Sequence, residues 1–241
     1  MVAFVGVLVL LTGCRVDAEV AITVDAEGGG EVAVTVELDA EAARQLGDPA
    51  AVGADDLRAA GWSVGDPESL DGDGLRFHAV RSFATPDQLA AVLDEVGGTD
   101  GVFREVQLTI EDRFGETEYR FGARVVLSGS PEQFSDDELA AQLDGLPLGR
   151  TPEELFLGGA LDPAAVTLRV VVDLPGGLPD TDGRFADGAA SWDFPVTGGE
   201  PTDERIASGS VVESSLAVLV AVGVLLLIAA AVVAVVAFRR R

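Results

Sequence analysis

VDAEVAITVD (residues 16–25) and EVAVTVELD (residues 31–39) alternate between apolar and polar side chains, and the glycine-rich segment AEGGG (26–30) separates them. Successive side chains of a strand point to opposite faces, so this period of two gathers the apolar residues on one face. Two such segments around a glycine-rich turn predict a β-hairpin with one dry face and one hydrated face.

The same alternation recurs along the chain and predicts further strands over 75–83, 102–111, 118–127, 166–173, 192–196 and 204–212. Short helices are expected over 40–46, 54–60 and 86–96 and within 128–162, and Thr85-Pro86-Asp87-Gln88 has the residues of a capping box. Strands joined by tight turns pair antiparallel. The expected class is therefore α+β: an antiparallel sheet of about eight strands with one apolar face and a few short helices.

The composition is strongly acidic. The formal net charge is −25 and the chain contains no lysine, so every fixed positive side chain is an arginine. A surface of this charge repels nucleic acid, which excludes that class of partner. The hydrophobic content of 48% is sufficient for a folded core.

The N-terminus has the pattern of a bacterial lipoprotein signal. Residues 2–10 are apolar but too short to span a bilayer, and they lead into Leu11, Thr12, Gly13 and Cys14, which match a lipobox. Residues 1–13 are thus predicted to be a signal peptide, and Cys14, the only cysteine, to carry a lipid. An ordinary signal peptide or a buried cysteine remains an alternative. Because Lys and Arg are missing before the apolar run, we expect the true translation start to lie upstream.

The C-terminus predicts a membrane anchor. Residues 216–238 form an uncharged apolar run long enough to cross about 30 Å of hydrocarbon as a helix, and Arg239, Arg240 and Arg241 follow it. Basic residues stay on the cytoplasmic side, which predicts a single-pass protein of the cell membrane with its folded domain outside the cytoplasm. The expected division is a domain over 14–205, a juxtamembrane segment over 206–215, the span and a basic tail over 239–241. A buried core helix is the alternative interpretation of the span.

No catalytic set is recognisable. Gly61-Trp62-Ser63-Val64-Gly65 matches the G-x-S-x-G pattern of serine hydrolases, but it follows a predicted helix rather than a strand. The only histidine, His78, is expected on the outer face of its strand. We therefore predict a protein that is not an enzyme and has no cofactor, with hydrolase chemistry kept only as an alternative for this motif.

Two acidic turns have some of the carboxylates of a calcium-binding loop. Asp71-Gly72-Asp73-Gly74 and Asp180-Thr181-Asp182-Gly183 lack the fifth-position and twelfth-position ligands of an EF-hand loop. Tight turns explain both segments better, and no metal site is predicted.

Several short motifs occur together across almost the whole chain. They are the lipobox, the hairpin after it, Gly61-Trp62 before Asp71-Gly72, Phe83-Ala84-Thr85-Pro86 at a helix start, Leu174-Pro175-Gly176, Trp192 and the C-terminal span with its basic tail. In this combination the chain resembles the LppM-type lipoproteins of actinobacteria. The resemblance implies an α+β domain outside the membrane and, as proposed for a mycobacterial member, a hydrophobic cavity for glycolipids of the phosphatidylinositol-mannoside type. The outer domain here is longer, with added helical sequence over 128–162.

A sheet with one apolar face and few helices needs a second layer, a partner or a ligand to cover it. Phe77, Val106, Phe121 and Leu168 are the candidate lining of a cavity, and an ordinary closed core is the alternative. We therefore predict a membrane-anchored extracytoplasmic lipoprotein of the cell envelope that binds a lipid or glycolipid. The alternative is a structural or protein-interaction module of an envelope complex, whose protein partner the sequence does not identify.

Overall fold

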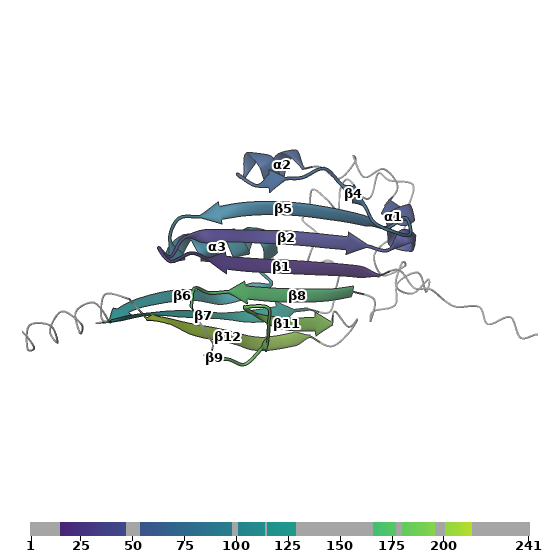
Figure 1. Cartoon of the computed structure of the whole chain (residues 1–241). Coiled ribbons are helices and arrows are strands. Elements are labelled where there is room, and N and C mark those ends of the chain that lie inside the picture. Colours follow the sequence, from purple (N-terminus) through teal and green to yellow (C-terminus); the bar gives the residue numbers. More distant parts are fainter. Residues whose placement is uncertain are drawn as a thin grey trace, which may run out of the picture.

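The computed structural model describes residues 15–46, 54–97, 101–113, 115–128, 166–176, 180–195 and 201–213. Its strands form two sheets (Figure 1). The large sheet has eight strands, in the order β10-β11-β8-β1-β2-β5-β3 with β4 also paired to β5. These strands are β1 (Val16–Val24), β2 (Gly30–Leu38), β3 (Ser63–Val64), β4 (Glu68–Ser69), β5 (Leu75–Phe83), β8 (Val166–Asp173), β10 (Arg184–Ala186) and β11 (Ala189–Pro195).

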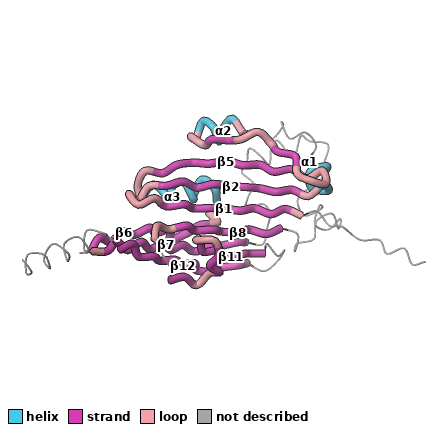
Figure 2. Tube along the Cα trace, viewed as in Figure 1, coloured by secondary structure: helices cyan, strands magenta, loops and turns pink. Residues whose placement is uncertain are grey.

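The small sheet has four strands, in the order β6-β7-β12-β9. They are β6 (Phe103–Arg113), β7 (Glu116–Leu127), β9 (Asp180–Thr181) and β12 (Thr202–Glu213). The helices of the described residues are α1 (Ala40–Leu46), α2 (Asp55–Ala59) and α3 (Pro86–Gly97). Figure 2 shows α1 at the end of β2 and α2 beside β5, at the border of the large sheet.

The predicted first hairpin is the centre of the large sheet. Val20 pairs with Val34 and Ile22 with Val32, so the apolar sets of β1 and β2 share one face. Val170 and Val172 of β8 continue this row on the other side of β1. We call this surface, which extends across β11, β8, β1, β2 and β5, the inner face.

One hydrophobic core fills the space between the inner face, the small sheet and α3. Leu89, Val92 and Leu93 of α3 are buried, as its apolar stripe predicts. The Gln88 side chain accepts a hydrogen bond from the Ala84 N–H at 2.9 Å, which orders the chain entering this helix. The Tyr119 hydroxyl donates to the Ala26 carbonyl at 2.8 Å and so ties β7 to the turn of the first hairpin.

The α+β class is confirmed, but the expected single antiparallel sheet is wrong in two respects. The strands divide between two sheets, and β1 pairs with β8 in parallel, from Val16 with Val166 to Thr23 with Asp173. The sequence separation between the two strands explains the second difference, because a parallel partner requires a long connection whereas a tight hairpin enforces an antiparallel one.

The predicted domain boundary at residue 205 falls inside β12. This strand pairs with β7 over its whole length, and Ile206, which the sequence placed in the juxtamembrane segment, is 1% exposed. The folded sheet therefore continues to Glu213.

No helix among the described residues is long and apolar enough to cross a bilayer. The predicted signal peptide over 1–13, Cys14, the helical sequence over 128–162 apart from residue 128, the span over 216–238 and Arg239–Arg241 all lie outside the described residues.

Candidate functional site

The two ends of the inner face differ in how well they are covered. At the end with Ile22 and Val32, both side chains are 0% exposed beneath the packed core. Toward the other end, Val36 and Phe77 are only half-buried, although they directly pair on the same face. The strand pattern is the same at both ends, so the difference comes from the layer above it.

An apolar pocket of about 610 Å³ lies at this second end. Its volume is within the roughly 300–1,000 Å³ of typical ligand pockets. Its floor comes from β2 and β5 and its sides from β3 and the two short helices. The main apolar lining residues are Val34, Val36, Leu38, Leu46, Leu57, Val64, Phe77 and Ala79.

The short helices do not close this pocket. Leu46 at the end of α1 is 37% exposed and Leu57 of α2 is 43% exposed, although both line it. The second helix stops early because Gly61, at φ +95°, ends it: the Gly61 N–H donates to the Arg58 carbonyl and the Trp62 N–H to the Leu57 carbonyl. These two bonds form a Schellman motif, which a residue at positive φ allows. The chain then enters β3, so α2 remains too short to cover this end of the sheet.

Three charged residues that line the pocket, Asp55, Arg58 and Asp66, are exposed and therefore lie at its border. Arg58 pairs with Asp55 at 3.2 Å, and Asp66 contributes a second carboxylate. The His78 ring lies on the opposite, outward face of the sheet, where it bonds to the Thr35 hydroxyl at 3.1 Å. Apolar walls with charges confined to the border suit a ligand that enters with a hydrocarbon part.

Trp62 and Arg81 form the boundary between the pocket end and α3. The indole Nε1–H of Trp62 donates to the Glu95 carboxylate at 3.1 Å, and Arg81 pairs with the same carboxylate. Trp62 is 5% exposed, as expected for a residue packed against the sheet. Through Glu95, these contacts tie α3 to β5 and to the segment that enters β3.

The four residues predicted to line one cavity are not brought together. Phe77 lines the pocket, whereas Phe121 and Leu168 are 2% and 4% exposed in the core. Val106 is half-buried against the same core. Sequence reasoning also missed Leu46 and Leu57, for which the available signal was an apolar residue on each of two helices too short to bury it.

The G-x-S-x-G segment has the context that the sequence indicated. Gly61 ends α2 and Ser63 begins β3, where it pairs with Val80. A nucleophile elbow instead places its serine between a strand and a helix. The His78 ring bonds to Thr35, and the His78 carbonyl accepts from the Gly65 N–H at 3.0 Å.

Both acidic turns serve the fold. The Leu70 N–H donates to the Gly74 carbonyl in the turn between β4 and β5. The Asp182 carboxylate accepts from the Trp192 indole at 2.9 Å and from the Ala207 N–H at 3.1 Å. Over the described ranges, no group of three or more His, Cys, Asp or Glu side chains is arranged to hold a metal ion.

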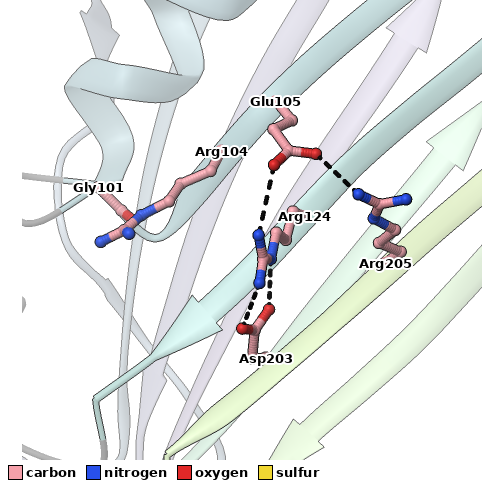
Figure 3. Close-up of polar contacts among 6 residues, drawn as sticks. All are labelled: Gly101, Arg104, Glu105, Arg124, Asp203 and Arg205. Atoms are coloured by element: carbon pink, nitrogen blue, oxygen red, sulfur yellow. Dashed lines mark hydrogen bonds and ion pairs between the residues drawn. The ribbon is translucent and has the colours of Figure 1, made fainter.

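The outward face of the small sheet carries an ion-pair network (Figure 3). Arg124 of β7 forms two bonds to Asp203 of β12, at 2.5 and 2.6 Å. Glu105, at φ +52° beside a register shift in β6, pairs with both Arg124 and Arg205 at 3.3 Å. The hydrogen bond from Arg124 lowers the pKa of Asp203 below its ordinary value. This network joins three strands on the outside of the sheet.

Comparison with solved structures finds a likeness to the NMR structure of the folded domain of LppM from Mycobacterium tuberculosis. It covers 85% of this chain and 94% of that chain, with 13% sequence identity and a TM-score of 0.44. The likeness is to the family that the sequence motifs resemble. No protein-family model and no curated protein matches the sequence.

Proposed function

We propose that this chain is a membrane-anchored, extracytoplasmic lipoprotein of the cell envelope that binds the hydrocarbon part of a lipid or glycolipid. The apolar pocket between the inner face and the two short helices is the observation that carries the proposal. The predicted lipobox and C-terminal span support the proposed location at the outer side of the cell membrane.

The exposure of Leu46 and Leu57 supports a ligand at this position. Exposed large apolar side chains are ordinary when scattered, but here two of them border the same apolar pocket. A hydrocarbon chain in the pocket would remove both side chains from water. The charged residues Arg58 and Asp66 at the border are placed to meet a polar headgroup outside.

Native mass spectrometry of the full chain, released from membranes in mild detergent, tests this function. We expect a lipid to remain bound and to leave on denaturation. Ala79→Trp fills the pocket and should abolish the bound mass. Ser82→Trp is the matched control, because Ser82 is exposed on the opposite face of the same strand. Equal lipid retention by both variants, or none by the parent chain, would refute the pocket as the site.

A structural or protein-interaction role is the second candidate, and the short pairing of β9 at the border of the small sheet favours it. Within the described part of the chain, β9 pairs only with Ser208 and Gly209 on that side of β12. A strand border with unpaired backbone groups can accept a strand from a partner. Cross-linking through a cysteine introduced in place of Val211, which is 44% exposed, would capture such a partner.

A further inference from the structure

The start of β1 lies beside the apolar pocket. Val16 pairs with Leu38, and Leu38 lines the pocket. The Arg15 N–H donates to the Asp39 carboxylate at 2.9 Å, and the Asp39 N–H donates back to the Arg15 carbonyl at 3.0 Å. The chain is therefore fixed to the sheet at Arg15, one residue after Cys14 in the sequence.

A second, polar hollow of about 530 Å³ lies beside this point and is bordered by Arg15 and Arg44. It shares the lining residue Leu38 with the apolar pocket. Polar and apolar lining residues thus both lie close to Arg15.

The end of β12 lies at the opposite end of the molecule. The Ser210 hydroxyl donates to the Pro175 carbonyl at 2.6 Å, just after β8, and β8 runs parallel to β1. Glu213 is consequently near the end of β1 and Val16 is about 26 Å away along that strand, at 3.3 Å per residue. Figure 1 shows the same arrangement, with β1 starting at one end of the molecule and β12 finishing at the other.

The two predicted membrane anchors therefore leave the domain from opposite ends. A span that begins at residue 216, three residues after Glu213, leaves the Cys14 end far from the bilayer whenever the strands stand upright on the membrane. A lipid at Cys14 then cannot reach the bilayer, because the next residue, Arg15, is fixed to the sheet. Each CH₂ group of the lipid that stays in water is unfavourable.

The pocket has the dimensions of one acyl chain. From Leu38 to Val34 its floor follows four residues of β2, about 13 Å. One leaflet of a bilayer, half of about 30 Å, sets the length of an acyl chain at about 15 Å. The occupant nearest to the pocket is thus the lipid of the chain itself.

We propose that an acyl chain on Cys14 occupies the apolar pocket of the same molecule, so that an incoming lipid must displace it. This inference rests on the proposed function, because it takes both the lipidation and the lipid-binding pocket from it. It adds the identity of the resident ligand and makes binding a competition between a tethered chain and a free one.

Photocross-linking of the full chain in membranes tests this proposal. The protein is produced in a lipoprotein-processing bacterium that is fed a diazirine-labelled fatty acid, and peptides are mapped after irradiation. We expect the lipid of the Cys14 peptide to be joined to peptides that contain Leu38 or Phe77. Ala79→Trp should reduce this adduct several-fold, and Ser82→Trp should not.

A charged residue at the exposed border provides a second variant that leaves the core intact. Leu57→Glu should also reduce the Cys14 adduct, because it places a carboxylate where the acyl chain enters. Thermal unfolding of each variant shows whether it is folded.

The remaining outcomes separate this inference from the proposed function. Pocket peptides that carry free lipid but no Cys14 lipid would overturn self-occupancy and leave lipid binding intact. An intact mass with unmodified Cys14 would overturn self-occupancy in the same way. The absence of any lipid adduct in the pocket would overturn both proposals.

Discussion

The two sheets of this protein expose their apolar faces to different surroundings. In the small sheet, Tyr119, Phe121 and Val125 of β7 are at most 2% exposed because the large sheet and its loops cover them. In the large sheet, Val36 and Phe77 have an equally apolar face, but among the described residues two short helices lie over it. Period-two patterning therefore determines which face of a sheet is apolar, whereas the neighbouring layer determines whether that face becomes core or pocket.

The outward faces of the two sheets are alike in their ion pairs. On the small sheet, Glu105, Arg124 and Asp203 link β6, β7 and β12 into one network. On the large sheet, Arg76 pairs with both Glu37 and Glu68, and Asp193 pairs with both Arg169 and Arg184. The difference between the sheets therefore lies in how well their apolar faces are covered, and we expect the small sheet to tolerate change least.

Removal of the last two-thirds of β12 should have the largest effect. Truncation after residue 205 deletes the pairing of β7 from Ala123 onward to Glu116 and removes the buried Ile206. The lost packing is comparable with the entire 5–15 kcal/mol that typically stabilises a domain, so the product should be unfolded. Truncation after Glu213 is the control and should give a cooperative unfolding transition by circular dichroism. Equal transitions for both products would show that the small sheet is dispensable.

Many elements of the fold were predictable from the sequence, and the limit of the prediction has a physical cause. The hairpin over 16–39, the helix starting at Pro86 and the strands around Phe121 follow local patterns, and the structure contains all of them. The parallel pairing of β1 with β8 and the separation into two sheets depend on contacts between residues far apart in sequence, which alternation does not encode.

The candidate site was predictable only in part for the same reason. Phe77 was expected to line a cavity because it is apolar and inward, and it does so. Phe121 and Leu168 are equally apolar and inward, but a second layer buries them. Their burial was not predictable without knowing that the small sheet packs against the large one.

Two alanine substitutions compare core with pocket directly. Phe121→Ala creates a cavity in the closed core and should cost roughly 3–5 kcal/mol of unfolding free energy. Phe77→Ala enlarges a space that is already open and should cost about 1 kcal/mol or less while weakening lipid retention. Urea denaturation measures the first quantity and native mass spectrometry the second. Equal losses of stability would show that the pocket end is packed as tightly as the core.

A smaller effect is expected at the contact between the small sheet and the first hairpin. Tyr119→Phe removes the hydrogen bond to the Ala26 carbonyl and should cost about 0.5–1.5 kcal/mol. Thr35→Val is the matched control, because the hydroxyl of Thr35 bonds to the exposed His78 on the outward face of the large sheet. We expect less than about 0.5 kcal/mol from it, as for most surface changes. A larger loss from Thr35→Val would contradict the view that the small sheet is the more tightly held.

The smallest effect should come from the ion pair on the outside of the small sheet, and it should depend on pH. The hydrogen bond from Arg124 lowers the pKa of Asp203 in the folded protein, so folding favours the ionised carboxylate. The resulting stabilisation is fully present above the unfolded pKa of about 3.9 and is lost as the pH falls through the lower folded value. The difference in thermal stability between the parent chain and Asp203→Asn should therefore be constant near neutral pH and shrink in acid. In the Arg124→Gln background, Asp203→Asn should change little at any pH, because the charge that favours the carboxylate is gone. A difference that persists in acid or in that background would assign the effect to something other than this pair.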